Sequence, residues 1–325
     1  MLIGAELFWH LLCVGQIKIP NLHLVVQKIR LGWVISRASE RPATSNYTPE
    51  EAACENDFKT THKRDEHGRF IVHLPFKEKL QITLGDSREA AIKRFYNLDR
   101  KFSRQPELKQ ECVNFINEYL ALGHMKLVDD WVNAKHDFYL PHLAVLKSES
   151  ITTKLRAVFG ASAKTSSGSS LNDILMVGPV IQGDLFSIVC RFRTYKIVLT
   201  ADIAKMYKQI LVANTCSRES FNYGTSSASF LATRALHQLA QEESATLPID
   251  SKMVLSDFYM DDLLTGADTP EMLERIFHEV NGILEKGSFN LRKWASNDQQ
   301  LLAKLLPDAV EPMVLNLDDH GSIKT

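Results

Sequence analysis

Two adjacent carboxylates, Asp261 and Asp262, interrupt an apolar and aromatic run that extends from residue 253 to residue 267. Residues 253–260 alternate as a strand does and 263–267 form a suitable partner, so we predict a hairpin with both acids in its tight turn. A third acid, Asp202, ends another predicted strand. Three converging carboxylates could hold two Mg²⁺ or Mn²⁺ ions, which clamp the attacking and leaving oxygens of a phosphoryl transfer. The alternative is an ordinary solvated Asp-Asp turn.

Strands and helices with regular apolar spacing must position these acids. The strands are expected at 70–76, 138–147, 154–159, 196–202 and 289–294. Helices are predicted to start after Ser226 or Ser227 and after Thr269, the latter ending at Gly287. Two earlier helices start after Ser87 and at Pro106. Their apolar spacing predicts that both serve only the core, with Ala91, Phe95, Leu98 and Phe102 facing inward in the first.

Composition restricts the class of protein. The chain has 325 residues, a net charge of −1 and 45% hydrophobic residues, as expected of a globular chain with a sizeable core. Residues 147–208 carry nine basic and four acidic side chains, which would suit phosphate contacts or a mixed solvated surface. The five cysteines form no C-x-x-C pair, so a reducing, cytoplasmic location is expected. The apolar start, residues 1–14, is too short to span a bilayer, and no membrane partner is predicted.

Several blocks carry a family resemblance. They are Tyr139–Lys147, Thr153–Phe159, Ser162–Thr165, Ser170–Asp173, Gly178-Pro179, Ala201–Ile203, Lys205–Tyr207, Tyr223–Ser227, Tyr259–Asp268 and Leu291–Trp294. In order and spacing they resemble the reverse transcriptase of BEL/Pao-type LTR retrotransposons. The resemblance implies an RNA-directed DNA polymerase that uses two Mg²⁺ or Mn²⁺ ions, deoxynucleoside triphosphates (dNTPs) and an RNA/DNA template-primer.

The resemblance also implies roles for individual residues. Asp202, Asp261 and Asp262 would be the catalytic, metal-binding acids. Lys154 and Arg156 would hold the incoming triphosphate, Tyr207 would exclude a ribose 2′-hydroxyl, and Gly224 would lie under the templating base. Tyr259 would contact substrate, and Lys164, Lys205 and Lys293 would contact nucleic acid. Without the family, Tyr207 is an ordinary core aromatic and each base an ordinary surface charge.

The implied fold is α+β: fingers and an antiparallel palm sheet backed by helices, over residues 67–300. Residues 1–36 resemble the end of a retropepsin-like protease, an all-β stub. The stub has no Asp-Thr-Gly or Asp-Ser-Gly, so no protease activity is expected. A polar linker is predicted at 37–66 and a tail at 301–325.

Two departures from the family pattern bear on activity. Gly160 stands where the family usually has Asp, which affects the nucleotide pocket. Residues 212–221 are too short for the palm hairpin that the family has there, so we predict a missing hairpin and a misplaced Asp202. The chain would then be a degenerate polymerase. The alternatives are a non-catalytic nucleic-acid-binding or inert remnant of a retrotransposon polyprotein, and a metal-dependent phosphotransferase of unrelated fold.

Overall fold

A computed structural model describes residues 12–19, 24–29, 32–37, 47–77, 84–125, 127, 138–146, 155–213, 218–220, 224–306 and 313–314. The chain forms two compact units that interleave along the sequence. The first unit comprises residues 1–46, 181–204 and 236–325, and the second comprises 47–180 and 205–235. Helices and antiparallel sheets occur together, so the predicted α+β class is confirmed at that level.

A five-stranded sheet forms the centre of the first unit. Its strands, in spatial order, are β11 (Phe258–Tyr259), β12 (Asp262–Ala267), β8 (Ile197–Ile203), β13 (Leu291–Ser296) and β14 (Met313–Val314). The pairings are antiparallel except for that of β13 with β14. The unit's helices are α6 (Leu185–Phe192), the second half of α7 (Ala228–Glu243), α8 (Pro248–Ser256), α9 (Pro270–Lys286) and α10 (Gln299–Leu305).

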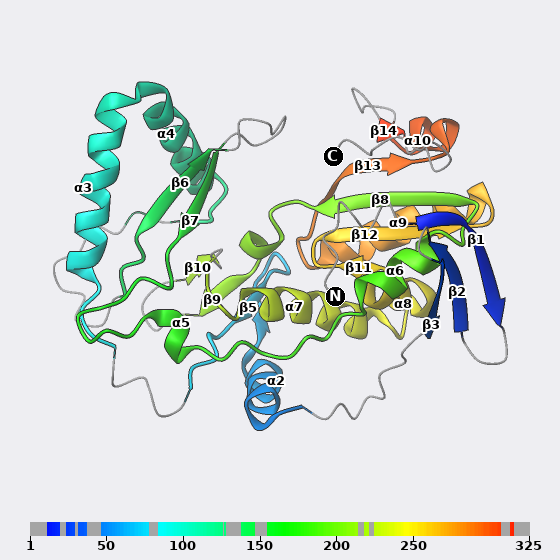
Figure 1. Ribbon diagram of the computed structural model, residues 1–325, viewed down its shortest axis with the longest axis horizontal. Helices are drawn as coiled ribbons and strands as arrows, with labels where there is room; N and C mark the ends of the chain where they lie inside the picture. Colours follow the sequence, from blue (N-terminus) through cyan, green and yellow to red (C-terminus); the bar gives the residue numbers. More distant parts are fainter. Residues whose placement is uncertain are drawn as a thin grey trace. The chain divides into compact units, whose positions relative to one another are not determined.

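Helix α9 covers one face of this sheet and follows from its sequence. The Thr269 side chain accepts a hydrogen bond from the Met272 N–H, and Pro270 occupies the first turn, where its missing N–H costs nothing. The predicted apolar face is buried (Leu273, Ile276, Phe277, Val280 and Leu284). Phe277 packs against Trp294 of β13 with ring centroids 4.6 Å apart. Figure 1 shows α9 passing behind β12 and β8.

The start of the chain forms a separate three-stranded antiparallel sheet in the first unit. Its strands are β1 (Leu12–Ile19), β2 (Leu24–Ile29) and β3 (Gly32–Arg37), joined in that order. The predicted all-β character of this segment therefore holds for its described residues. Its resemblance to a protease remnant stays a prediction.

The second unit contains two sheets and four complete helices among its described residues. Strands β10 (Arg218–Ser220), β9 (Leu211–Ala213), β5 (Phe70–Val72) and β4 (Lys63–Arg64) form one sheet, and β6 (His142–Leu146) pairs with β7 (Leu155–Phe159). The complete helices are α2 (Pro49–Thr61), α3 (Arg88–Arg104), α4 (Pro106–Ala121) and the short α5 (Leu171–Ile174). The first half of α7 completes the unit.

Two expectations about secondary structure were wrong. Within the predicted linker, residues 49–61 form α2, which a Thr48–Glu51 capping box starts and which buries Cys54 and Phe58. Residues 253–256 belong to α8 and not to a strand, because Pro248 starts a helix that ends only at Asp257. A short apolar run has no clear period, so the alternation was misleading.

The predicted absence of the family's palm hairpin after residue 212 stays a prediction, although a short strand pair forms at this place in the chain. Strands β9 and β10 pair antiparallel, with Val212 opposite Glu219. The hairpin is short and belongs to the sheet of the second unit, next to β5. The nearby residues of β8 keep a regular register with β12, so the misplacement predicted for Asp202 is not observed.

The surface of α3 differs from the prediction as well. Leu98 is buried as expected, but the Phe95 side chain is 54% exposed. Ser87 precedes the helix without capping it; its Oγ instead accepts a hydrogen bond from the Tyr139 N–H. In the part of the chain that the structure describes, no helix is both long and apolar enough to cross a bilayer.

Candidate carboxylate site

Asp202 and Asp262 are direct cross-strand partners at the end of the central sheet. The register of β8 with β12 pairs Asp262 with Asp202 and continues without interruption to Ala267 opposite Ile197. Directly opposite residues of an antiparallel pair place their side chains on the same face of the sheet. Both flanking residues of Asp202, Ala201 and Ile203, are buried, so Asp202 lies on the face opposite the core. The contact inferred between these two strands is therefore present.

Asp261 reaches the same place through a two-residue turn. Phe258 pairs with Leu263 and Tyr259 with Asp262, so Met260 and Asp261 form the turn. The prediction that both acids lie in the turn was wrong for Asp262, which is the first residue of β12. Met260 has a φ of 57°, which a tight hairpin turn requires of its first central residue. The Met260 N–H donates to Gln182 Oε1 at 3.0 Å, and the Ile203 N–H donates to the Asp261 carbonyl at 2.8 Å. These two bonds hold the turn against β8 and against the segment before α6.

Two cations neutralise Asp202 from the opposite strand. Arg292 pairs with Asp202 in the β13–β8 register, and its Nε donates to Asp202 Oδ1 at 2.9 Å. Lys293 Nζ donates to Asp202 Oδ2 at 3.0 Å. Successive residues of a regular strand point to opposite faces, so in a regular β13 Arg292 and Lys293 could not both reach Asp202. A β-bulge between Arg292 and Ala295, with Lys293 at a φ of 54°, turns the lysine toward Asp202.

Asp262 differs from the ion-paired Asp202 in that its pKa is raised. Partial loss of hydration raises the pKa of Asp262 to about 6, and the charges of Asp261 and Asp202 add to the shift. The side chain keeps accessible surface, so the carboxyl can still exchange protons and ligands with solvent. Like charges directly opposite each other destabilise a sheet. The chain offsets this repulsion by ion-pairing Asp202 and by favouring a proton on Asp262.

The donor set suits a hard divalent cation, but the side chains are not arranged as a closed ligand group. All three acids offer only oxygen, the ligand that Mg²⁺ and Mn²⁺ prefer. A dication would relieve the repulsion that raises the pKa of Asp262. Among the described residues, however, no group of three or more His, Cys, Asp or Glu side chains is placed to hold a metal ion. Asp202 would have to leave Arg292 and Lys293 to join its neighbours.

Asp257 holds the β11–β12 hairpin through hydrogen bonds to β12. Its side chain is buried and accepts hydrogen bonds from Thr265 Oγ1 and Ser256 Oγ, each at 2.8 Å. The guanidinium of Arg191 on α6 lies 2.8 Å from the same carboxylate and also donates to the Ser256 carbonyl. The Leu264 N–H donates to the Asp257 carbonyl at 2.9 Å. One buried acid thus links α6, the end of α8 and β12, which carries Asp262.

The other predicted substrate residues are divided between the two units. Tyr259 lies in β11 opposite Asp262, in the first unit. Tyr207 is buried in a 3₁₀ turn, Met206–Gln209, of the second unit, with its hydroxyl 3.4 Å from Ser229 Oγ. Arg156 is described only in its backbone, opposite Val145, and Lys154 lies outside the described residues.

Gly224 occupies a backbone position that few other residues could take. Its φ is 118°, and an added Cβ would lie 2.0 Å from the Phe159 carbonyl oxygen. Asn172 holds the same loop at two points. Its Nδ2 donates to the Gly224 carbonyl and its Oδ1 accepts from the Ser226 N–H, both at 2.8 Å. The close approach at Gly224 is thus to the Phe159 carbonyl oxygen, and its place under a templating base stays a prediction.

Each lysine predicted to contact nucleic acid forms an ion pair within its own unit. Lys164 Nζ lies 2.6 Å from Asp173 Oδ2, Lys205 pairs with Glu118, and Lys293 pairs with Asp202. A phosphate would have to compete with a carboxylate for each of them. Their role in binding nucleic acid stays a prediction.

Three residues of the site were missed by reading the sequence. Arg292 stood inside a recognised block, and its position one residue before Lys293 was the available signal. Asp257 is a single acid at the end of an apolar segment. Gln182 bonds to the turn at Met260 from about 80 residues away in the sequence. Neither has a local pattern that predicts its contact.

Neither a comparison with protein-family models nor a comparison with curated proteins finds a match to this chain.

Proposed function

We propose that this chain is an RNA-directed DNA polymerase unit of the BEL/Pao retrotransposon kind, with Asp202, Asp261 and Asp262 as its metal-binding acids. Its substrates would be dNTPs and an RNA/DNA template-primer, in the cytoplasm. The observation that carries the proposal is the cross-strand pairing of Asp202 with Asp262 beside the Met260-Asp261 turn. Acids this close repel one another, and the divalent ions of a nucleotidyl-transfer site would offset that repulsion.

The chain's own groups would divide the work as follows. Asp262, with its pKa raised to about 6, loses its proton near neutral pH and becomes available as a ligand. Gln182 and the Ile203 N–H hold the turn that carries Asp261, so the acid does not need to be ordered when substrate arrives. Two divalent ions, when bound, would orient the 3′-hydroxyl and stabilise charge on the leaving diphosphate. Lys293 and Arg292, released from Asp202, could then face a phosphate.

A second candidate function rests on the same ion pairs. Arg292 and Lys293 neutralise Asp202 by two ion pairs. If these pairs persist, the site is closed and the chain is a non-catalytic, nucleic-acid-binding remnant. The difference between the two candidates is therefore whether a divalent ion displaces two cations from Asp202.

Primer extension distinguishes the candidates. The full chain is incubated with an RNA template, a DNA primer and dNTPs, with Mg²⁺ or Mn²⁺, beside the double variant Asp261→Asn/Asp262→Asn. The matched control is Glu271→Gln/Glu285→Gln, which removes two exposed acids from α9. The parent and the control should incorporate dNTPs equally. The Asp261→Asn/Asp262→Asn variant should lose incorporation by at least about 100-fold, since the loss of electrostatic stabilisation at a phosphoryl-transfer centre costs that much.

The polymerase proposal fails if the parent incorporates nothing with either metal, or if the variant incorporates as much as the parent. A folded parent without incorporation leaves the non-catalytic candidate. Circular dichroism of each variant shows whether it has folded.

A further inference from the structure

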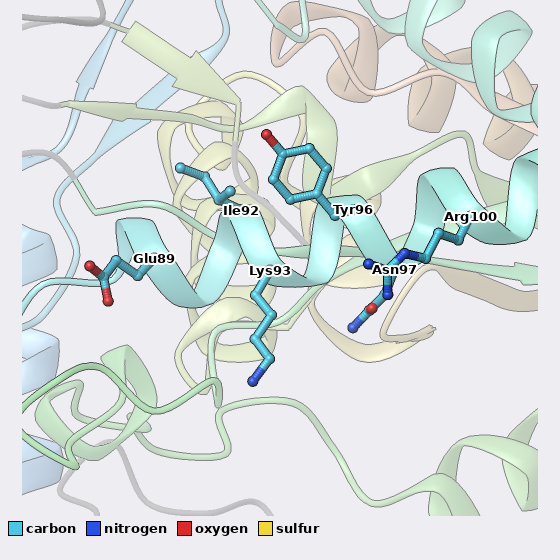
Figure 2. A pocket seen from close by; sticks show the side chains of 6 residues that line it. All are labelled: Glu89, Ile92, Lys93, Tyr96, Asn97 and Arg100. Carbon is cyan, nitrogen blue, oxygen red and sulfur yellow. The ribbon is translucent and has the colours of Figure 1, made fainter.

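Helix α3 carries large apolar side chains on its solvent side. Ile92, Phe95 and Tyr96 are 39%, 54% and 59% exposed. Ile92 and Tyr96 are one turn apart and help to line an open hollow of about 350 Å³ along the helix. We call the residues of this hollow the α3 face, and they are Glu89, Ile92, Lys93, Tyr96, Asn97 and Arg100. Figure 2 shows Ile92 and Tyr96 leaving the same edge of the helix and Lys93 leaving the other edge.

The same helix is strongly basic. It contains six basic residues and two acidic ones, in a chain whose net charge is −1. The part of the chain that the structure describes provides no carboxylate in an ion pair with Lys93 or Arg100. In this they differ from Lys164, Lys205 and Lys293, each of which forms an ion pair. Among the described residues, the α3 face thus combines one acid, Glu89, with two cations that form no ion pair, and its net charge favours an outside anion.

An exposed aromatic ring next to basic side chains has a specific binding chemistry. Tyr96 offers a ring on which a nucleobase can stack. Lys93 and Arg100 lie about one turn before and one turn after it in the helix, Lys93 at the other edge, where they can meet phosphates. Asn97 adds an amide that can bond a base edge or a ribose. A second copy of the chain would bring the same positive helix against itself, which charge repulsion opposes. A base-paired duplex hides the faces of its bases, so stacking on Tyr96 requires a single strand.

We infer that the α3 face is a binding site for single-stranded nucleic acid, with Tyr96 as a stacking platform and Lys93 and Arg100 as phosphate contacts. The inference does not depend on the proposed polymerase activity. Helix α3 belongs to the second unit, and Asp202, Asp261 and Asp262 belong to the first.

Fluorescence anisotropy tests the inference with the full chain and a labelled oligouridine of about 12 nucleotides. The buffer contains EDTA and no dNTP, so a failed polymerase site cannot affect the result. Tyr96→Ala should weaken binding by about fivefold or more, and Tyr96→Trp should retain it, because stacking needs only a ring. Lys93→Ala/Arg100→Ala should lower the slope of log K against log salt by about 1.4, whereas Tyr96→Ala should leave the slope unchanged.

The control for the charge change is Lys109→Ala/Lys252→Ala, which removes two exposed lysines from other helices. It should bind like the parent. The Asp261→Asn/Asp262→Asn variant should also bind like the parent, which separates this inference from the polymerase proposal.

Several results would overturn the inference. One is equal binding by the parent, Tyr96→Ala and Lys93→Ala/Arg100→Ala, each shown to be folded by circular dichroism. Another is tighter binding of a blunt RNA duplex than of oligouridine. A third is competition by poly-glutamate as effective as that by unlabelled oligouridine, which would indicate an acidic protein partner instead.

Discussion

Lys293 Nζ lies 3.0 Å from Asp202 Oδ2, and the lysine reaches that carboxylate because it occupies the left-handed region of the backbone. A non-glycine residue pays about 1 kcal/mol or more for this conformation. Lys293 also sits at the one-residue bulge that lets Arg292 and Lys293 face the same acid. Such strain often accompanies a functional constraint. The bulge in β13 thus brings two positive charges to Asp202.

Removing this lysine should make Asp202 easier for a metal ion to reach. Lys293→Gly deletes the ammonium and suits the positive φ, so the fold should not suffer. We expect Mn²⁺ affinity to rise by up to about fivefold at low salt, the magnitude of one exposed ion pair. Titration of the Mn²⁺ electron paramagnetic resonance signal measures it. Lys304→Ala, which removes a lysine paired with Glu274, is the control and should leave affinity unchanged. Weaker Mn²⁺ binding by Lys293→Gly would show that Lys293 and the metal ion do not compete for Asp202.

Asp257 should be a stability determinant of the hairpin. Asp257→Ala leaves Arg191 and the buried Thr265 hydroxyl without their partner, and we expect it to lower the free energy of unfolding by about 3 kcal/mol. Thr265→Val removes one bond to the carboxylate and should cost about 1.5 kcal/mol. Denaturant titration gives both values. Asp268→Ala removes an exposed acid just after β12 and should change stability by less than about 0.5 kcal/mol. A similar small change for Asp257→Ala would refute the anchoring role.

The sequence predicted those parts of the site that depend on local pattern. The strand ending at Asp202, the turn at Asp261 and the capped helix after Thr269 all have short-range signals, and all are present. The ion pairs of Asp202 depend on a bulge in β13, which exists only in the register of that strand with β8. The bond from Met260 to Gln182 depends on tertiary contact in the same way. The exposure of Phe95 was missed because helical spacing gives the apolar side chains of a helix without showing how much partner surface is available.

Gly224 and Gly168 form a natural pair for testing close backbone approach. Both have positive φ, so replacement by alanine costs each about 1 kcal/mol of strain. An added Cβ meets nothing within 4 Å at Gly168, whereas at Gly224 it meets the Phe159 carbonyl oxygen at 2.0 Å. We expect Gly224→Ala to lower the free energy of unfolding by about 3 kcal/mol and Gly168→Ala by about 1 kcal/mol. Equal values from denaturant titration would show that the loop moves away at no cost.

Asp250 of α8 should make stability depend on pH. It is buried, and Oδ2 has no hydrogen-bond donor among the described residues. Burial, followed by a hydrogen bond to Glu279 of α9, raises the pKa of Asp250 to about 6. A proton on Asp250 lets it donate to Glu279, whose own pKa this bond and Arg275 lower.

A raised carboxyl pKa means that the folded chain binds a proton more tightly than the unfolded chain. The stabilisation from protonated Asp250 is therefore complete below about pH 4 and is lost as pH rises to about 6. Asp250→Asn keeps a donor for Glu279 at every pH. It should raise the free energy of unfolding at pH 7 by about 1 kcal/mol relative to the parent, and the gain should vanish near pH 4. Thermal unfolding of both proteins across this range measures the difference. A gain that is the same at pH 4 and pH 7 would mean that Asp250 does not hold a proton in the folded chain.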